Sequence, residues 1–271
     1  MAIRTLIVIP ARYASTRFPG KPLAEIAGVS MIKRAALQAE KASETLPETD
    51  YVVATDDERI MEHCAQNGTR AVMTDPALAS GSDRTLAAVD LTAPEAKFVI
   101  NLQGDAPFTP VSYLKAVSEA LEQSDTEVAT PCYQLTWSAL DELRRQKRTT
   151  PHSGTTCVIG AEGQAVWFSK SILPQIRNET SLREKSALSP VFQHIGLYGF
   201  RRSALEQFTK LKPSRYEQIE GLEQLRLLEN NIRIECVVVQ PTPLSTSGVD
   251  TPEDLARLEA LIAEHGDQAD S

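Results

Sequence analysis

The sequence predicts an α/β fold built on a mostly parallel β-sheet. Short apolar runs without polar alternation, typical of strands buried on both faces, recur along the first half of the chain. Between them lie segments with apolar residues at three- and four-residue spacing, which is typical of amphipathic helices. Strands and helices that alternate in this way are joined by right-handed crossovers, so we expect the strands to lie side by side in parallel.

The elements of the first half follow from these two patterns. Buried strands are predicted at residues 5–10, 51–55, 71–74, 98–103 and 127–135. Helices are predicted at residues 30–42, 57–68, 82–91 and 110–123. Three polar residues are positioned to cap the first three of these helices: Ser30, Asp56 and Ser82.

The second half has a less regular pattern. Residues 155–170 predict a hairpin that turns at 161–163, and further strands are predicted at 196–202 and 233–240. Helices are predicted at 216–230 and 251–266, the second with Thr251 as its N-cap and Pro252 in its first turn. A continuous helix over 216–230 would turn a polar face outward, comprising Glu220, Glu223, Gln224 and Leu227. Its opposite, core-facing side would comprise Ile219, Leu222, Leu225 and Leu228.

Composition bounds the domain organisation and the class of protein. A chain of 271 residues, 42% of them hydrophobic, is long enough to bury a sizeable core. No repeat or Gly/Ser-rich linker interrupts it, so we expect one domain over residues 1–265 and a disordered tail at 266–271. The formal net charge of -8 argues against a nucleic-acid-binding surface, which is usually basic.

Cysteine usage and the N-terminus indicate a cytoplasmic protein without a membrane partner. The four cysteines, at positions 64, 132, 157 and 236, form no CxxC pair and no zinc-finger spacing. We therefore expect free thiols in a reducing compartment rather than a structural zinc site. The first apolar run is too short for a signal peptide, and no segment has the apolar length of a membrane span.

A cluster of cations follows the first predicted strand. In residues 10–23, PARYASTRFPGKPL, Pro10 ends the strand and Gly20 permits a positive φ or a close backbone approach. Arg12, Arg17 and Lys21 could surround an anion with several negative oxygens, such as a triphosphate. In open parallel sheets ligands bind beyond the carboxyl ends of the strands, where this loop lies. The alternative is a solvated loop whose cations pair with nearby carboxylates; neither a P-loop nor a dinucleotide-binding fingerprint is present.

Two carboxylates are candidate magnesium ligands. Asp105 follows the fourth predicted strand and should reach the same edge of the sheet as the basic loop. Asp250 directly precedes the last predicted helix. Mg²⁺ commonly takes one or two carboxylates together with phosphate oxygens. The alternatives are that Asp105 bonds turn amides and that Asp250 satisfies amides at the helix start. His194, which lies in an apolar neighbourhood, could equally be a structural histidine.

Eight motifs together resemble the CMP-Kdo synthetases, the 3-deoxy-manno-octulosonate (Kdo) cytidylyltransferases. In chain order from about residue 5 to 260 they are IPARYASTRFPGKPL, VVATDD, VMTDPALASGSDR, NLQGDAP, WFSKSILP, HIGLYGFRR, EGLEQLR and GVDTPEDL. The resemblance implies a nucleotide-diphospho-sugar transferase-like three-layer sandwich with a smaller, hairpin-containing dimerisation subregion, and a homodimer. It also implies that CTP activates an acidic 2-keto sugar for lipopolysaccharide synthesis.

The resemblance also implies roles for individual residues. The triphosphate would be held by Arg12, Arg17 and Lys21, and the rest of the nucleotide by Ser80 and Arg84. Mg²⁺ would be held by Asp105 and Asp250, which with Arg12 and Lys21 form the expected catalytic set. The sugar pocket would comprise Gln103, Arg177, His194, Tyr198, Glu223 and Gln224.

The chain departs from the family pattern at three places. Ala106 stands where an acid often follows the QGD aspartate, Thr156 replaces a customary Lys, and only Arg177 aligns well between residues 176 and 190. These departures flank the expected acceptor side. Two alternatives therefore stay open: a cytidylyltransferase for another acidic sugar, such as 8-amino-Kdo or a nonulosonate, and a nucleotide-sensing relative without turnover.

Overall fold

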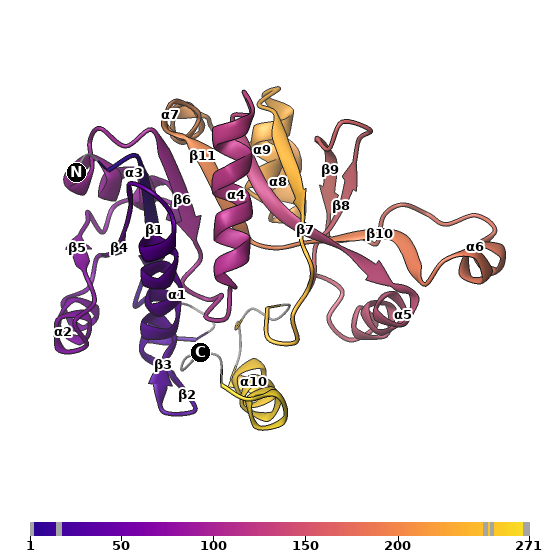
Figure 1. Ribbon diagram of the computed structural model, residues 1–271, viewed down its shortest axis with the longest axis horizontal. Coiled ribbons are helices and arrows are strands. Elements are labelled where there is room, and N and C mark those ends of the chain that lie inside the picture. The colour runs from indigo at the N-terminus through magenta and orange to yellow at the C-terminus, as the bar shows by residue number, and fades with distance from the viewer. Residues whose placement is uncertain (1–2, 15–17, 246–248, 250–251, 268–271) are drawn as a thin grey trace.

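The fold is a central ten-stranded sheet covered by helices on both faces. The computed structural model describes residues 3–14, 18–245, 249 and 252–267. The strand order is β5-β4-β1-β6-β11-β7-β10-β8-β9, with β12 paired to β7 (Figure 1). This architecture confirms the predicted α/β class. Among the described residues, no helix combines the length and the apolar character needed to cross a membrane.

The first half of the chain forms the parallel part of the sheet. All five predicted strands are confirmed, as β1 (Thr5–Ala11), β4 (Thr49–Thr55), β5 (Ala71–Met73), β6 (Phe98–Leu102) and β7 (Val128–Thr136). Strands β5, β4, β1 and β6 pair in parallel. Their carboxyl ends therefore share one edge, where the loops after β1 and β6 meet.

The four helices predicted between these strands are also confirmed. They are α1 (Met31–Thr45), α2 (Glu58–Gln66), α3 (Gly81–Thr92) and α4 (Val111–Gln123). Alternate residues of β1 enter two different cores: Ile7 and Ile9 face the cluster that includes α1 and α4, whereas Leu6 and Val8 face the cluster that includes α3. Burial of the strand on both faces, complete except at Pro10, explains its uninterrupted apolar run.

Two of the three predicted N-caps are wrong. Ser30 caps α1 as expected, by accepting the amide hydrogen of Lys33. Helix α2 is capped by Asp57 rather than Asp56. The Asp56 carboxylate is instead bonded to Arg84 of α3 at 2.6 Å. Helix α3 begins earlier than predicted, because Ser80 forms a reciprocal capping box with Asp83.

The second half adds the antiparallel part of the sheet. The predicted hairpin is confirmed as β8 (Thr156–Ile159) and β9 (Ala165–Ser169), and the two later strands as β11 (Leu197–Arg201) and β12 (Ile234–Val238). Strand β11 is inserted between β6 and β7 and is antiparallel to both. Strand β10 (Leu188–His194), which the sequence did not indicate, joins β7 to β8.

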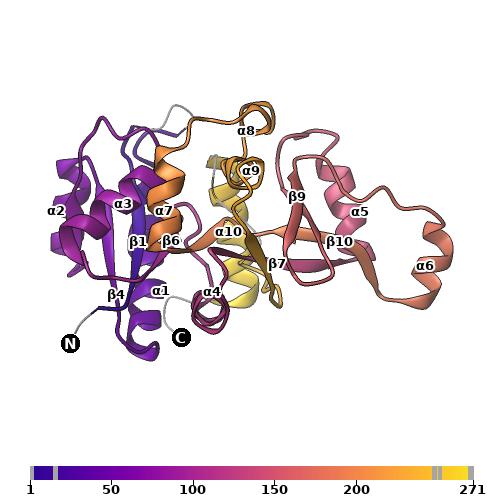
Figure 2. The ribbon, with the colours of Figure 1, turned by 90° about the horizontal axis from the view of Figure 1, so that it is seen from above.

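Three helices of this half were not predicted: α5 (Trp137–Gln146), α6 (Glu179–Lys185) and α7 (Arg202–Lys210). The hairpin, β10, α5 and α6 extend to one side of the molecule, opposite α2 and β5 (Figures 1 and 2). A short 3-10 helix η1 (Lys21–Leu23) and the strand pair β2 (Glu25–Ile26) and β3 (Val29–Ser30) complete the described elements before α1. Helix α10 (Pro252–His265) confirms the last predicted helix, and its proposed cap Thr251 lies outside the described residues.

The continuous helix predicted at 216–230 is wrong. The segment forms two short helices, α8 (Arg215–Glu220) and α9 (Gln224–Glu229). Gly221 ends α8 in the left-handed conformation, with φ of 64°. Because the break rotates one half against the other, Ile219 is 68% exposed and Leu227 is buried, the reverse of the prediction for these two residues. Leu222 and Leu225 are buried as predicted.

The start of the predicted C-terminal tail, Gly266 and Asp267, is among the described residues. The Asp267 carboxylate is bonded to the buried Arg34 guanidinium at 2.6 and 2.8 Å. Residues 268–271 lie outside the described part of the chain.

Candidate active site

Two adjoining cavities lie at the carboxyl ends of β1 and β6. The first, here called the basic cavity, has a volume of about 490 Å³, and its lining includes Arg12, Lys21, Ser80, Arg84, Asp105 and Glu223. The second, here called the histidine cavity, has a volume of about 350 Å³, and its lining includes Gln103, Asp105, Lys170, His194, Tyr198 and Gln224. Gln103 and Asp105 line both cavities, so a ligand in one would lie beside a ligand in the other.

The loops after β1 and β6 approach each other closely at this edge. A Cβ atom on Gly104 would lie 2.9 Å from the carbonyl oxygen of Pro10, so only glycine fits here without a backbone shift. Gly20, in the basic loop, has a positive φ of 71°, one of the two alternatives that the sequence indicated. The close approach fixes Asp105 next to the basic loop, where the Lys21 ammonium lies 2.9 Å from its Oδ2 atom.

The basic cavity collects the cations that the sequence predicted at this edge. The Arg12 guanidinium donates to the carbonyl of Leu78 and, at 3.4 Å, to that of Ser80, which ties the basic loop to the start of α3. The amino terminus of α3, at Gly81, lines the same cavity, and the positive end of a helix dipole favours anions. The structure therefore brings Arg12, Lys21 and a helix start to one cavity, which Arg84 also lines. Arg17 lies outside the described residues.

Arg84 lies at the floor of this cavity. Its side chain is fully buried and donates to Asp56 and to the Thr74 hydroxyl. Its Nε–H group has no hydrogen-bond partner among the described residues. A buried donor without a partner is costly, and an acceptor atom of a bound ligand would satisfy it.

The acidic residues of the site differ in environment. The Asp105 side chain is 42% exposed and bonded to Lys21. Burial raises the pKa of Glu223, which accepts a hydrogen bond from the Ser82 hydroxyl at 3.1 Å. Glu223 lines the basic cavity, not the histidine cavity in which the sugar set was expected. Asp250 lies outside the described residues, but the amide of its neighbour Val249 donates to the Asp105 carbonyl at 3.1 Å.

Four of the expected sugar-pocket residues meet in the histidine cavity: Gln103, His194, Tyr198 and Gln224. The His194 Nε2 atom lies 2.9 Å from the Thr130 hydroxyl. Burial, with a smaller effect of Lys170, lowers the pKa of His194 well below its ordinary value, so its imidazole is neutral at pH 7. Burial likewise raises the pKa of Tyr198, which keeps its phenol protonated. Both rings therefore offer neutral hydrogen-bonding groups. Arg177 is exposed and is not in the lining of either cavity.

Lys170 is a cation of the histidine cavity that sequence reasoning missed. It follows β9, and its backbone amide donates to the Glu220 carboxylate at 2.8 Å. Glu220 also accepts from the Ser169 hydroxyl at 2.8 Å. Glu220 thus anchors the end of β9 against the end of α8. The only sequence signal was a lysine in the WFSKSILP motif, at the end of the predicted hairpin.

The two departures next to the site have different surroundings. Ala106 lines the histidine cavity. Thr156 is fully buried in β8, where its hydroxyl donates to the Ser171 carbonyl at 2.7 Å and accepts from the Leu173 amide at 3.1 Å. Of the two side chains, the structure brings only Ala106 to a cavity.

Comparisons of sequence and of structure both relate this chain to cytidylyltransferases. A sequence model described as cytidylyltransferase matches residues 6–234. The 3-deoxy-manno-octulosonate cytidylyltransferase of Maricaulis maris (strain MCS10) is 44% identical over 97% of this chain and 98% of its own length. The enzyme of the same name from Vibrio parahaemolyticus is 35% identical over 95% of this chain and 97% of its own.

A solved structure of a CMP:2-keto-3-deoxy-manno-octonic acid synthetase complexed with CTP superposes with a TM-score of 0.80 at 33% identity. It covers 96% of this chain and 99% of that one. The matches extend over nearly the whole chain and include the loops that build both cavities. The chain therefore belongs to the cytidylyltransferase family and, within it, to the 3-deoxy-manno-octulosonate cytidylyltransferases.

Proposed function

We propose that this protein transfers CMP from CTP to the anomeric 2-hydroxyl of Kdo, with release of pyrophosphate. The hydroxyl oxygen attacks the α-phosphorus, the bond from that phosphorus to the β-phosphate oxygen breaks, and the hydroxyl proton is lost. The observation that supports this reaction best is the pair of cavities that adjoin at Gln103 and Asp105, one basic and one lined by neutral polar rings. Such a reaction depends chiefly on positioning and charge neutralisation.

The basic cavity has the properties of a CTP site. Arg12 and Lys21 would neutralise the triphosphate, and the amino terminus of α3 would add backbone donors. The unpartnered Nε–H group of Arg84 offers a further donor to a nucleotide oxygen. The family neighbour that was solved with CTP supports the same assignment.

Magnesium dependence is part of the proposal. The Asp105 carboxylate lies at the junction of the two cavities and keeps part of its surface open, which suits a hard cation that prefers carboxylate and phosphate oxygens. Asp105, with Asp250, would hold the ion. When bound, Mg²⁺ supplies charge neutralisation at the phosphates. The Lys21 ammonium, 2.9 Å from Oδ2, holds the Asp105 carboxylate in place at this junction.

The histidine cavity would hold the acidic sugar. Lys170 provides a cation for its carboxylate, while Gln103, His194 and Gln224 provide neutral hydrogen-bonding groups for its hydroxyls. Because Gln103 and Asp105 line both cavities, a sugar bound here would place its attacking hydroxyl next to the phosphates. Arg177 and Glu223 stay in the proposal as predicted sugar-binding residues.

Pyrophosphate release from CTP, measured with Kdo, 8-amino-Kdo and a nonulosonate as acceptors, tests the proposal. Turnover that is fastest with Kdo is expected. Ala106 in the acceptor cavity is the observation that favours a second candidate, a cytidylyltransferase for one of the other two acids. Binding of CTP without pyrophosphate release for any acceptor would support a nucleotide-sensing protein and reject the enzyme.

The variant Asp105→Asn tests the metal assignment. We expect kcat/KM to fall by on the order of 10², because a charge that acts at the phosphates is lost. Asp125→Asn is the matched control, since Asp125 is exposed between α4 and β7 and lies in neither cavity. Wild-type turnover of Asp105→Asn at saturating Mg²⁺ would reject the assignment.

A homodimer in the cytoplasm, which makes the activated sugar for lipopolysaccharide synthesis, completes the proposal. Exposed apolar side chains on β9, α6 and β10 support assembly through this subregion: Val166, Leu182 and Leu188. Light scattering should give twice the chain mass for the wild type. A monomeric mass at micromolar concentration would reject the dimer.

A further inference from the structure

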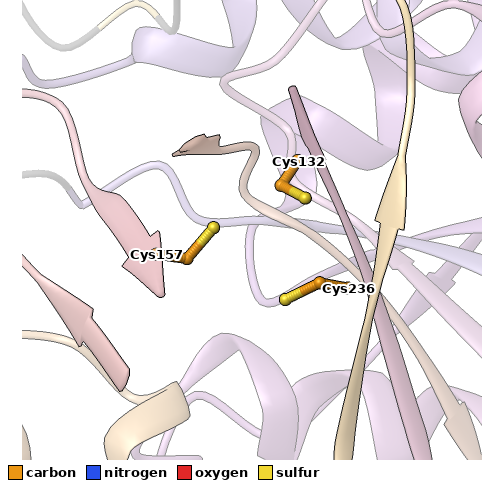
Figure 3. Close-up of side chains that lie close together, drawn as sticks. All are labelled: Cys132, Cys157 and Cys236. Carbon is orange, nitrogen blue, oxygen red and sulfur yellow. The ribbon is translucent and has the colours of Figure 1, made fainter. Parts of the chain in front are cut away.

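Three of the four cysteines come together inside the antiparallel half of the sheet. The sulfur atoms of Cys132, Cys157 and Cys236 all lie within 4.8 Å of one another. Figure 3 shows the three side chains, from β7, β8 and β12, directed toward a common space. All three residues are buried, with exposed fractions of 0%, 1% and 5%. We call them the cysteine trio.

The trio lies inside a strongly curled part of the sheet. Strands β7, β10, β8 and β9 pair in that order, and β12 pairs with β7. The curl brings β9 back to β12, because Gln164 forms a bridge with Glu235 and the Cys236 amide donates to the Gly163 carbonyl at 2.9 Å. Strands that curl in this way turn alternate side chains into a common interior. The inward residues here belong to one apolar cluster that also includes Phe168.

The geometry points to a site for one thiophilic divalent metal ion, zinc by its chemistry, and we propose that the cysteine trio binds this ion through its three sulfurs. Zn–S bonds of about 2.3 Å require sulfur atoms about 3.8–4.0 Å apart. Since no pair of sulfurs is separated by more than 4.8 Å, a closure of about 1 Å or less completes the site. Soft thiolate ligands select zinc and its heavier relatives over magnesium or calcium.

The chemistry of the three thiols agrees with this assignment. All four cysteines of the chain are free of disulfides, so the three sulfurs are available as ligands. Three thiolates around a divalent ion leave a single net negative charge, which a buried site tolerates better than three separate anions.

The ion would stabilise the wall of the histidine cavity without taking part in the reaction. In the β7–β10 pair Cys132 lies opposite His194, and in the β10–β8 pair Cys157 lies opposite Phe192. An ion bound by the trio would join β7, β8 and β12 at the position where β10 carries Gln193 and His194 into the cavity. The site differs from the proposed magnesium site in its ligands, its metal and its place in the fold.

The test measures metal content and ligand type in the full chain. Because the trio is buried, the protein is produced in zinc-supplemented cells, so that the ion is present as the chain folds, and is then dialysed against a chelator. We expect mass spectrometry to give about one zinc ion per chain, and X-ray absorption spectra to show three sulfur ligands to that ion. Cd²⁺ supplied in place of zinc should give the ultraviolet charge-transfer band of cadmium thiolates.

Single variants identify the ligands. The zinc content of Cys157→Ala after dialysis should be at least tenfold lower than that of the wild type. Cys64→Ala, which removes the buried cysteine of α2, should keep the wild-type zinc content. Zinc should raise the Tm of the wild type by about 5 °C or more, and leave that of Cys157→Ala unchanged. If Cys157→Ala does not fold, the sulfur count in the wild type decides. A zinc content below about 0.2 ions per chain, the level of adventitious metal, would overturn the proposal. A metal site without sulfur ligands would also overturn it.

Discussion

The close approach of the loops after β1 and β6 makes Gly104→Ala an informative substitution. The new Cβ atom would lie 2.9 Å from the carbonyl oxygen of Pro10, whereas ordinary contacts begin at 3.4 Å. The neighbour is backbone, so no side-chain rotation relieves the overlap. One loop must therefore move by about 0.5 Å, and both carry residues of the basic cavity. Since a misplacement of about 1 Å can cost about 10² in rate, we expect kcat/KM to fall by about tenfold.

The assay is steady-state pyrophosphate release with CTP and Kdo, combined with thermal unfolding. Overpacking of this kind costs about 1–3 kcal/mol, so the Tm of Gly104→Ala should fall by about 2 °C or more. Gly81→Ala is the matched control for folding, because its Cβ would meet the ring of Pro10 at 3.7 and 3.9 Å, ordinary contact distances. Wild-type kcat/KM together with wild-type Tm for Gly104→Ala would refute the claim that this contact sets the geometry of the site.

Two further substitutions test the parts of the fold that support the cavities. The Lys147 ammonium donates to the carbonyls of Ser153, Gly154 and Lys170 at 2.6, 3.0 and 2.5 Å, so Lys147→Met should raise the KM for the sugar by on the order of tenfold. The KM for CTP should stay unchanged, and an equal rise in both would contradict this reasoning. The buried Arg226 guanidinium donates to Glu217 at 2.8 Å, so Arg226→Met should lower the free energy of unfolding by about 3–5 kcal/mol in urea titrations at pH 7. Although burial opposes the effect, hydrogen bonds from Arg226 lower the pKa of Glu217 below 4.5. The pair therefore stabilises the protein above about pH 4.5, and this contribution is lost as the pH falls through the lower folded-state value. Adding Glu217→Gln to Arg226→Met should recover part of the stability, and no recovery would contradict the unpaired-charge explanation.

The first half of the fold could be predicted because β1, β6 and most of β4 are buried on both faces, although the edge strand β5 is only partly buried. The uninterrupted apolar run of β1 reflects the two cores that it contacts, one on each side of the sheet. Helix caps were harder, because adjacent polar residues compete for the same position. Asp56 and Asp57 are equivalent in the local sequence. The choice between them depends on Arg84, a partner 28 residues away that takes the Asp56 carboxylate.

Local patterns failed where tertiary contacts override them. The segment 216–230 has a helical period throughout, yet Gly221 breaks it, and the Glu220 carboxylate then reaches the end of β9. Strand β10 was missed because its burial does not follow its polarity: Leu188 is exposed and Ser189 is buried. Pro190 also stands within it, and proline is rare inside strands. The basic loop and Asp105 were predicted to meet, since parallel strands share one carboxyl edge. Lys170 could not be placed in the same way, because it reaches its cavity from the antiparallel half.

The cysteine trio could not be predicted, because its assembly depends on how distant strands of the sheet pair. Cys132, Cys157 and Cys236 are separated by 25 and 79 residues, which no metal-binding spacing rule covers. The sequence predicts free thiols rather than a zinc site, and the structure confirms that none of the four forms a disulfide. It also brings three of the sulfurs within 4.8 Å of one another, which the spacing did not indicate. Their encounter follows from the curl that returns β9 to β12, a property of pairing between distant strands rather than of any local segment.

The two halves of the sheet also carry different cavities, the basic cavity in the parallel half and much of the histidine cavity in the antiparallel half. The basic cavity is built mainly on the ends of β1 and β6 and the start of α3, elements held by the parallel core. Arg12, Lys21 and Arg84 line it. The histidine cavity draws on the hairpin, β10 and the break before α9. Thr156 has both its hydrogen bonds inside the protein, so a change there acts on the acceptor only through the backbone of β8. Ala106 lines the cavity itself. A difference in acceptor choice among relatives should therefore follow the residue at position 106 more closely than the residue at position 156.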